Sequence, residues 1–196
     1  NSHHDLAMQE ANNKTVLGDF DNATFIYEGV TTTFSRRGDE YWVKTDNESG
    51  ELQDYRVAYV FGVYPLQQLL LPLQNDRLNA LSIAWDARNA SEGGQRWYHI
   101  YEDQEPVTSE SPLHWTGVYH NWNSRCAECH STNVVKGYDG KRRQYTTTYD
   151  QIDVGCEACH GPGSRHVELA TAGKVNRSQS PAEMGLALSL AARGQW

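Results

Sequence analysis

The sequence Cys126-Ala127-Glu128-Cys129-His130 is followed, 25 residues later, by a second copy of the same pattern, Cys156-Glu157-Ala158-Cys159-His160. The two copies contain all four cysteines of the 196-residue chain. In c-type attachment, both thiols of such a motif add to haem vinyl groups and the adjacent histidine ligates the iron. The pattern therefore predicts two covalently bound haems c, whose cofactor-binding residues are Cys126, Cys129, His130, Cys156, Cys159 and His160.

Other uses of four cysteines fit the spacing less well. A zinc ribbon usually separates its two Cys-x-x-Cys knuckles by about 15 to 20 residues, and it does not need a histidine after each knuckle. A thioredoxin-like dithiol needs one copy of the motif beside a strand-helix-strand unit. Two disulfide bridges are the remaining alternative for a secreted chain. The two histidines and the longer interval between the motifs favour haem.

The composition is that of a polar chain with many loops. Hydrophobic residues make up 38% and charged residues 21%, and there are 16 glycines. Bound porphyrins would supply part of the apolar surface that such a chain lacks. The net charge of −8 argues against a nucleic-acid partner and against a basic membrane-binding surface.

The sequence predicts no membrane span. The most apolar stretch, Val57 to Leu73, is shorter than 18 residues and is interrupted by Gly62 and Pro65. The chain begins at Asn1 and shows no signal peptide, so we expect a mature product or a piece of a longer protein. Because this type of haem attachment takes place outside the cytoplasm, we expect a periplasmic or extracellular location.

The first half of the chain has the pattern of an antiparallel β-meander. Short runs rich in β-branched and aromatic residues alternate with turn signals, which is typical of such strands. The expected strands are Thr24 to Tyr27, Thr31 to Phe34, Tyr41 to Lys44, Tyr55 to Tyr64, Leu78 to Trp85 and Arg96 to Tyr101. Gln67 to Leu73 fits either a strand or a helix.

The second half is expected to be a cytochrome segment with short helices. Each haem motif should occupy a helical turn, and a hairpin over Val134 to Tyr149, turning at Tyr138-Asp139-Gly140, should lie between them. Helices are expected from Ser164 to Ala172 and from Pro181 to Arg193. The predicted fold class is therefore α+β and loop-rich, with an N-terminal segment at 1–22, a β-rich region at 23–111 and a dihaem region at 112–196.

The sixth ligand of each iron separates electron carriers from catalysts. Our candidates are the histidines His114, His166, His4 and His3, of which His3 ranks last, whereas His99 and His120 are expected to be structural. His166 follows His160 by only six residues and cannot easily reach the opposite face of the same haem, so it should serve a different iron. A sixth ligand from Met8 would raise the potential, but the surplus of histidines makes it less favoured.

Several stretches occur together in one family, and they cover most of the chain: Ser2 to Met8, Phe61 to Gln68, Ala84 to Asp86, Gly93 to Trp97, His114 to Gly117, Asn121 to Asn123, Cys126 to Asn133 and Gly155 to Val167. They resemble bacterial multihaem cytochromes c in which a haem region precedes tetratricopeptide repeats. The Cys-His-Gly-Pro-Gly-x-x-His element also resembles bis-histidine electron-transfer cytochromes. The resemblance implies that His166, His114 and one of His3 or His4 are distal ligands.

The chain departs from that family in lacking the repeats and the further haem motifs that usually lie upstream and downstream. Three distal histidines then face two haems, which predicts a truncated chain or a ligand donated to a neighbouring subunit. The function we expect is electron transfer between redox partner proteins through two bis-histidine haems. The alternatives are an enzyme with one five-coordinate iron that reduces a small nitrogen or sulfur oxyanion or peroxide, and a subunit of a conductive filament built from copies of the chain.

Overall fold

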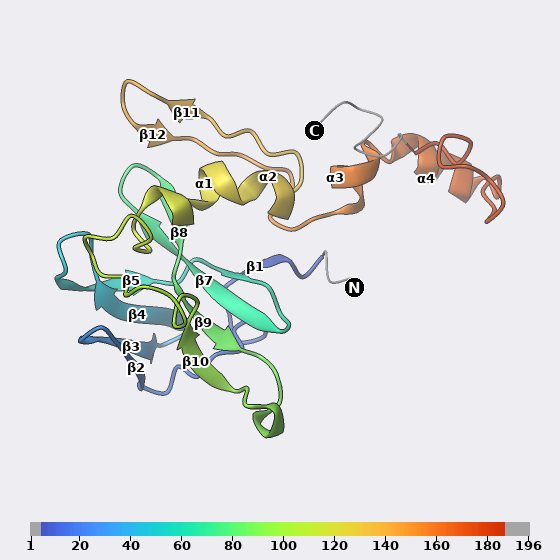
Figure 1. The fold of residues 1–196 in the computed structure, drawn as a ribbon. Helices are drawn as coiled ribbons and strands as arrows, with labels where there is room; N and C mark the ends of the chain where they lie inside the picture. The colour runs from blue at the N-terminus through green and yellow to red at the C-terminus, as the bar shows by residue number, and fades with distance from the viewer. Residues whose placement is uncertain (1–4, 187–196) are drawn as a thin grey trace.

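The computed structural model describes residues 5–186, and it confirms the predicted α+β class. Antiparallel strands build two sheets in the first half of the chain, and short helices follow (Figure 1). The strands of the first half are β1 (Met8–Glu10), β2 (Ala23–Tyr27), β3 (Val30–Arg37), β4 (Glu40–Asp46), β5 (Leu52–Arg56), β6 (Tyr59–Phe61), β7 (Leu66–Leu73), β8 (Arg77–Ala80), β9 (Ile83–Asp86) and β10 (Arg96–His99).

One sheet is the expected meander, and the other is not. Strands β2 to β5 pair in chain order, whereas the six-stranded sheet has the order β1-β6-β7-β9-β10 with β8 paired to β7. Two predicted strands were therefore wrong in extent. Tyr55 to Tyr64 is divided between β5 and β6 in different sheets, and Leu78 to Trp85 is divided between β8 and β9. The ambiguous segment Gln67 to Leu73 lies in a strand, β7.

The two sheets enclose a core of aromatic and aliphatic side chains. Alternate residues of β3 point inward, so that Thr32 and Phe34 are buried while their neighbours are not. The Phe34 ring stacks on the Trp97 indole at 3.7 Å. Burying an aromatic side chain of this size stabilises the fold by about 2 to 3 kcal/mol, so this contact between the sheets is a major part of the core.

A second, smaller core joins the six-stranded sheet to the helices. Leu70 of β7 points away from the first core and packs with Met8, Ala80 and Trp122. The Trp122 indole donates a hydrogen bond to the Met8 sulfur at 2.9 Å, so the thioether is already engaged within the protein. This core fixes the element that carries the first haem motif to the sheet.

The helices and remaining strands follow these cores. They are the 3-10 turns η1 (Ala90–Glu92) and η2 (Val118–His120), the helices α1 (Trp122–Arg125), α2 (Ala127–His130), α3 (Cys156–His160) and α4 (Ser164–Thr171), and the strands β11 (Tyr138–Asp139) and β12 (Gln144–Tyr145). No described helix has the length and apolar character of a membrane span.

The predicted hairpin and helices are confirmed in part. The hairpin forms, but Tyr138 and Asp139 belong to its first strand and the turn occupies 140–143. The helix expected at Ser164 to Ala172 is α4. The helix expected at Pro181 to Arg193 lies mostly outside the described residues, and 181–185 form a turn that is preceded by the predicted Ser180–Glu183 capping contacts.

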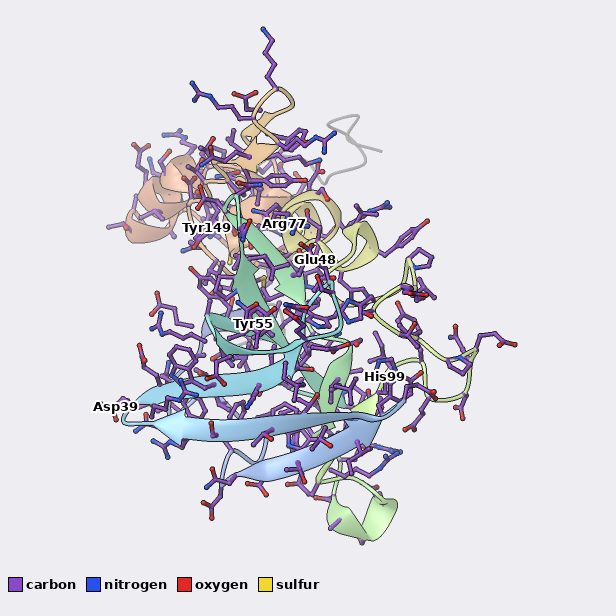
Figure 2. All side chains as sticks on the ribbon, turned by 90° about the vertical axis from the view of Figure 1, so that its left-hand side faces the viewer. Asp39, Glu48, Tyr55, Arg77, His99 and Tyr149 are labelled. Atoms are coloured by element: carbon purple, nitrogen blue, oxygen red, sulfur yellow. The ribbon has the colours of Figure 1, made fainter. Side chains whose placement is uncertain are left out.

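His99 and His120 are buried within the β-region, as expected of structural histidines. The His99 ring stacks on Tyr27 at 3.7 Å, and its Nδ1 accepts a hydrogen bond from the backbone N–H of Tyr101. Burial, followed by the nearby His120 and His114 rings, lowers the pKa of His99 to about 4. In Figure 2, His99 lies among the strands, far below Tyr149. The neutral ring is therefore part of the fold.

This depressed pKa predicts a loss of stability in mild acid. The unfolded state binds a proton at His99 below about pH 6.5, whereas the folded state resists it down to about pH 4. The stabilisation is complete above pH 6.5 and falls by roughly 2 to 3 kcal/mol as the pH approaches 4. We expect His99→Asn to flatten the pH dependence of the urea midpoint between pH 7 and pH 4. An unchanged slope would contradict this origin of the acid sensitivity.

Candidate haem-binding site

The first haem motif lies on a single helical turn. Cys126 precedes α2, and the backbone N–H groups of Cys129 and His130 donate to its carbonyl at 3.1 and 3.0 Å. Residues three and four positions apart face the same side of a helix, so this turn places two thiols and one imidazole together. The second motif repeats the arrangement in α3. Both predicted helical turns are confirmed.

The four thiols are free, and three of them are exposed: Cys129, Cys156 and Cys159. Burial, followed by the neighbouring Cys129, raises the pKa of Cys126. A reactive dithiol or a zinc knuckle requires a thiolate, which a lowered pKa would favour. Within 5–186, no three His, Cys, Asp or Glu side chains converge as metal ligands would. The arrangement suits addition of each thiol to an external group.

The two proximal histidines have the same unusual environment. The Nδ1 atoms of His130 and His160 are buried, and among the described residues neither has a hydrogen-bond partner. Burial lowers the pKa of His130, so its ring is neutral near pH 7. The Phe61 ring meets the His130 ring edge-on at 4.6 Å. A neutral imidazole fixed by an apolar neighbour is the form that ligates iron, so these residues fit haem.

A short antiparallel ladder joins the two motifs. The residues directly after the first motif pair with those directly before the second, through bridges at Thr132–Gln151 and Val135–Thr148. The buried Ser131 hydroxyl donates to the Ile152 carbonyl at 2.6 Å. The ladder therefore fixes the separation of the two candidate haem sites.

Thr132 is the centre of that ladder. Its backbone N–H donates to Gln151 and its carbonyl accepts from Asp150, both at 3.0 Å. Its hydroxyl donates to the Asp153 carbonyl at 2.9 Å and accepts from the Gly155 N–H at 2.8 Å. Gly155 caps the start of α3, so one buried side chain connects the end of the first motif to the start of the second.

His166 is presented as a ligand would be. Its Nδ1 donates to the Met184 carbonyl at 2.8 Å, which leaves Nε2 as the nitrogen with a lone pair. Before it, α3 ends at Gly161, whose φ of 67° is favourable for glycine and turns the chain into α4. The predicted change of direction between His160 and His166 is therefore present.

His114 has a different environment from the one its candidate role requires. Its side chain is buried, Nδ1 meets the Thr116 hydroxyl at 2.8 Å, and Nε2 meets Asp46 Oδ2 at 3.2 Å. Both ring nitrogens are thus engaged inside the β-region. Ligation of iron by His114 would require one of these contacts to break.

His3 and His4 lie outside the described residues, but the segment that follows them is well placed. Strand β1 pairs with β6, which brings Met8 opposite Phe61, the neighbour of His130. Partial burial, followed by the charge of Asp5, raises the pKa of Asp153. Asp5 therefore lies near the segment that leads into the second motif, and the chain after His4 runs between the two sites.

The aromatic residues expected around the haems divide into two groups. Trp115 and Trp122 are almost fully buried, Trp115 against Tyr55 in the sheet core and Trp122 in the smaller core beside Cys126. Tyr119 and Tyr138 are more than half exposed. Of these four, Trp122 is the one that packs directly with the first motif.

Sequence reasoning missed the residues that hold the motifs in place. Thr132 and Ser131 follow the first motif without a distinctive pattern of their own. The contact that orients His166 uses a backbone carbonyl, which leaves no trace in the sequence. A pair of hydroxyl residues directly after the motif was the one available signal.

The role of the Thr132 hydroxyl can be measured directly. We expect Thr132→Val to leave the Gly155 N–H and the Asp153 carbonyl without a partner, at a cost of about 1 to 3 kcal/mol. Hydrogen exchange at the Gly155 amide should become at least tenfold faster. Thr132→Ser keeps the hydroxyl and is the matched control. Equal protection in wild type and Thr132→Val would show that the hydroxyl does not hold α3.

Comparison with known proteins agrees with this geometry. The family model described as cytochrome c554 and c-prime matches residues 85–161, less than half of the chain, from strand β9 to the end of the second motif. Comparisons with curated proteins and with solved structures found no match. The matched region contains both Cys-x-x-Cys-His turns. The family match supports a c-type cytochrome that binds haem c covalently and acts in electron transfer.

Proposed function

We propose that the chain binds two haems c and passes single electrons between redox partner proteins outside the cytoplasm. The observation that carries this proposal is the pair of helical turns, each with two free thiols and one imidazole, joined by the Thr132 ladder. When bound, each haem supplies an iron that gains or loses one electron. The location follows from the general property that c-type cytochromes are extracytoplasmic.

The cofactor-binding residues have distinct roles in this proposal. Cys126 and Cys129 hold one porphyrin while His130 takes the proximal position, and Cys156, Cys159 and His160 do the same for the other. Trp122, Phe61 and Ala127 exclude water from the side of the first site that faces the sheet. Exclusion of water and the choice of axial ligand are the protein's main means of setting the potential.

For the distal positions we propose His166 and one of His3 or His4. The Met184 carbonyl holds His166 in the tautomer that exposes the Nε2 lone pair. Asp5 lies near Asp153, so the N-terminal pair is within a few residues of the second site's entrance. His114 is the weaker candidate, because Asp46 and Thr116 occupy both of its nitrogens.

The haem count is the first test. We expect the mass of the purified protein to exceed that of the polypeptide by two haems, with the pyridine haemochrome absorbance of two thioether-linked groups per chain. The double variants Cys126→Ser/Cys129→Ser and Cys156→Ser/Cys159→Ser should each lose one haem. A wild-type mass equal to that of the bare polypeptide would end the proposal.

The distal role of His166 gives the second test. We expect the reduced wild-type protein to be low-spin and not to bind carbon monoxide, because six-coordinate iron has no open position. His166→Ala should open one site, giving a high-spin band and binding of about one carbon monoxide per chain. His99→Asn removes a histidine of the β-region and should stay low-spin. Carbon monoxide binding by the wild type would instead favour a catalytic haem.

A further inference from the structure

The most basic short segment of this acidic chain is the hairpin between the two haem motifs. Residues 136–143, Lys-Gly-Tyr-Asp-Gly-Lys-Arg-Arg, contain four cationic side chains and one aspartate. The segment carries +3 in a chain of net charge −8, so the other residues together carry −11. A local reversal of sign of this size creates a field that attracts anionic groups, while the rest of the surface repels them.

The cationic side chains of the hairpin face solvent. Lys136, Lys141, Arg142 and Arg143 are all exposed. Within the described chain, Arg142 is the one that meets a carboxylate, through a 3.8 Å contact with Asp139 in which the Arg142 side chain remains 79% exposed. Exposed ion pairs of this length contribute little, so the positive charge of the hairpin is available to a partner.

The hairpin is fixed to the body of the protein. The Gln144 amide donates to Asp76 at 2.9 Å, and the Tyr145 N–H donates to the Asn75 carbonyl at 3.1 Å. At its base, the Thr147 hydroxyl accepts from the Asn123 amide at 3.0 Å. A surface that is already ordered loses less entropy when a partner binds.

A groove of about 370 Å³ lies where the hairpin meets α1 and the turn before β8. Its walls include the Tyr138 and Tyr145 rings, which lie 4.7 Å apart, the exposed Val118, and the guanidinium groups of Arg77 and Arg143. Aromatic side chains and arginines are the residues most enriched where proteins associate. The groove therefore combines an apolar floor with a positive rim.

The groove adjoins the first haem motif. Ser124 lines it, and Cys126 follows two residues later. Figure 1 shows the hairpin projecting above α1 and α2, with its base leading to both motif turns. An electron carrier that docks here is brought to the part of the chain where the first haem attaches.

From these observations we propose that the hairpin 136–143 and the adjoining groove form the docking surface for a one-electron carrier protein with an acidic face. This inference rests on the proposed electron-transfer function. Positive charges on the hairpin steer the carrier, and Tyr138, Tyr145 and Val118 provide the apolar contact. In the exchange, the carrier loses one electron and one haem iron gains it, with no atom transferred.

A small acidic [2Fe–2S] ferredoxin, reduced with dithionite and freed of excess reductant, is a suitable probe. The rate of haem reduction after rapid mixing is the readout. We expect the second-order rate constant for wild-type holoprotein to fall about tenfold between 20 mM and 200 mM salt. In Lys141→Glu/Arg143→Glu we expect a loss of about tenfold at low salt and little dependence on salt.

The control changes the net charge by the same amount elsewhere. Lys14 and Lys44 are exposed residues outside the hairpin, so Lys14→Glu/Lys44→Glu tests total charge alone. We expect it to lower the rate no more than about twofold. Equal losses in the two double variants would overturn the docking surface, because net charge would then explain the rate. Haem content and spectrum, measured first in every variant, report separately on the proposed function.

Two further measurements remove the remaining explanations. A cationic reagent, hexaammineruthenium(II), should reduce Lys141→Glu/Arg143→Glu at least as fast as it reduces the wild type, which shows that the variant's haems remain competent. Size-exclusion chromatography at low salt tests whether the acidic remainder of a second copy occupies the hairpin. A wild-type dimer that Lys141→Glu/Arg143→Glu dissociates would replace the carrier by a second copy and overturn the proposal.

Discussion

The constraint on which the rest of the site depends is that two thiols and an imidazole must share one helical turn. Helices of four or five residues, such as α2 and α3, are not stable in isolation, because nucleation costs more than a single turn returns. Contacts outside the turn must therefore hold it. For α2 these are the burial of Ala127 and the Trp122 helix that precedes it. For α3 they are the Thr132 hydroxyl at its start and Gly161 at its end.

This difference makes the first site the better preformed of the two. The first turn lies against the sheet through Leu70 and Trp122, and its histidine already meets Phe61. The second turn has no buried residue, and neither has α4. Its position is set by the ladder and by the contact between His166 and Met184. Covalent attachment of a porphyrin supplies the apolar surface against which such a segment can pack.

The sequence predicted the strands well, but it predicted their grouping poorly. Alternation in β3 and β4 is visible in the sequence because one face of each strand is buried. The breaks after Arg56 and after Ala80 are not visible, because the residues that follow them are buried in the first core and remain apolar. The chain changes sheets there for reasons of tertiary packing. Likewise, β7 is a strand because β6 and β9 pair with it, which a short apolar run cannot reveal.

The motifs could be predicted because their chemistry is local, whereas the distal ligands could not be ranked. His114 and His166 are both histidines near a motif, yet the partner of His114 is Asp46, 68 residues away, and the partner of His166 is a backbone carbonyl. Neither partner is marked in the sequence. The same distance in sequence hid the relation of Asp5 to Asp153.

The two halves of the chain derive their stability from different sources, and this bears on how the protein assembles. The β-region has a continuous core from Phe20 to Trp115 that includes no residue of either haem motif. Such a core needs no cofactor to form. The part after the ladder has exposed helices, three exposed thiols and proximal rings whose buried Nδ1 atoms lack partners. The β-region can therefore fold first and present the first motif on an ordered surface, while α3 and α4 depend on attachment for much of their packing. Order in the sheets precedes the chemistry, and the chemistry completes the order of the rest.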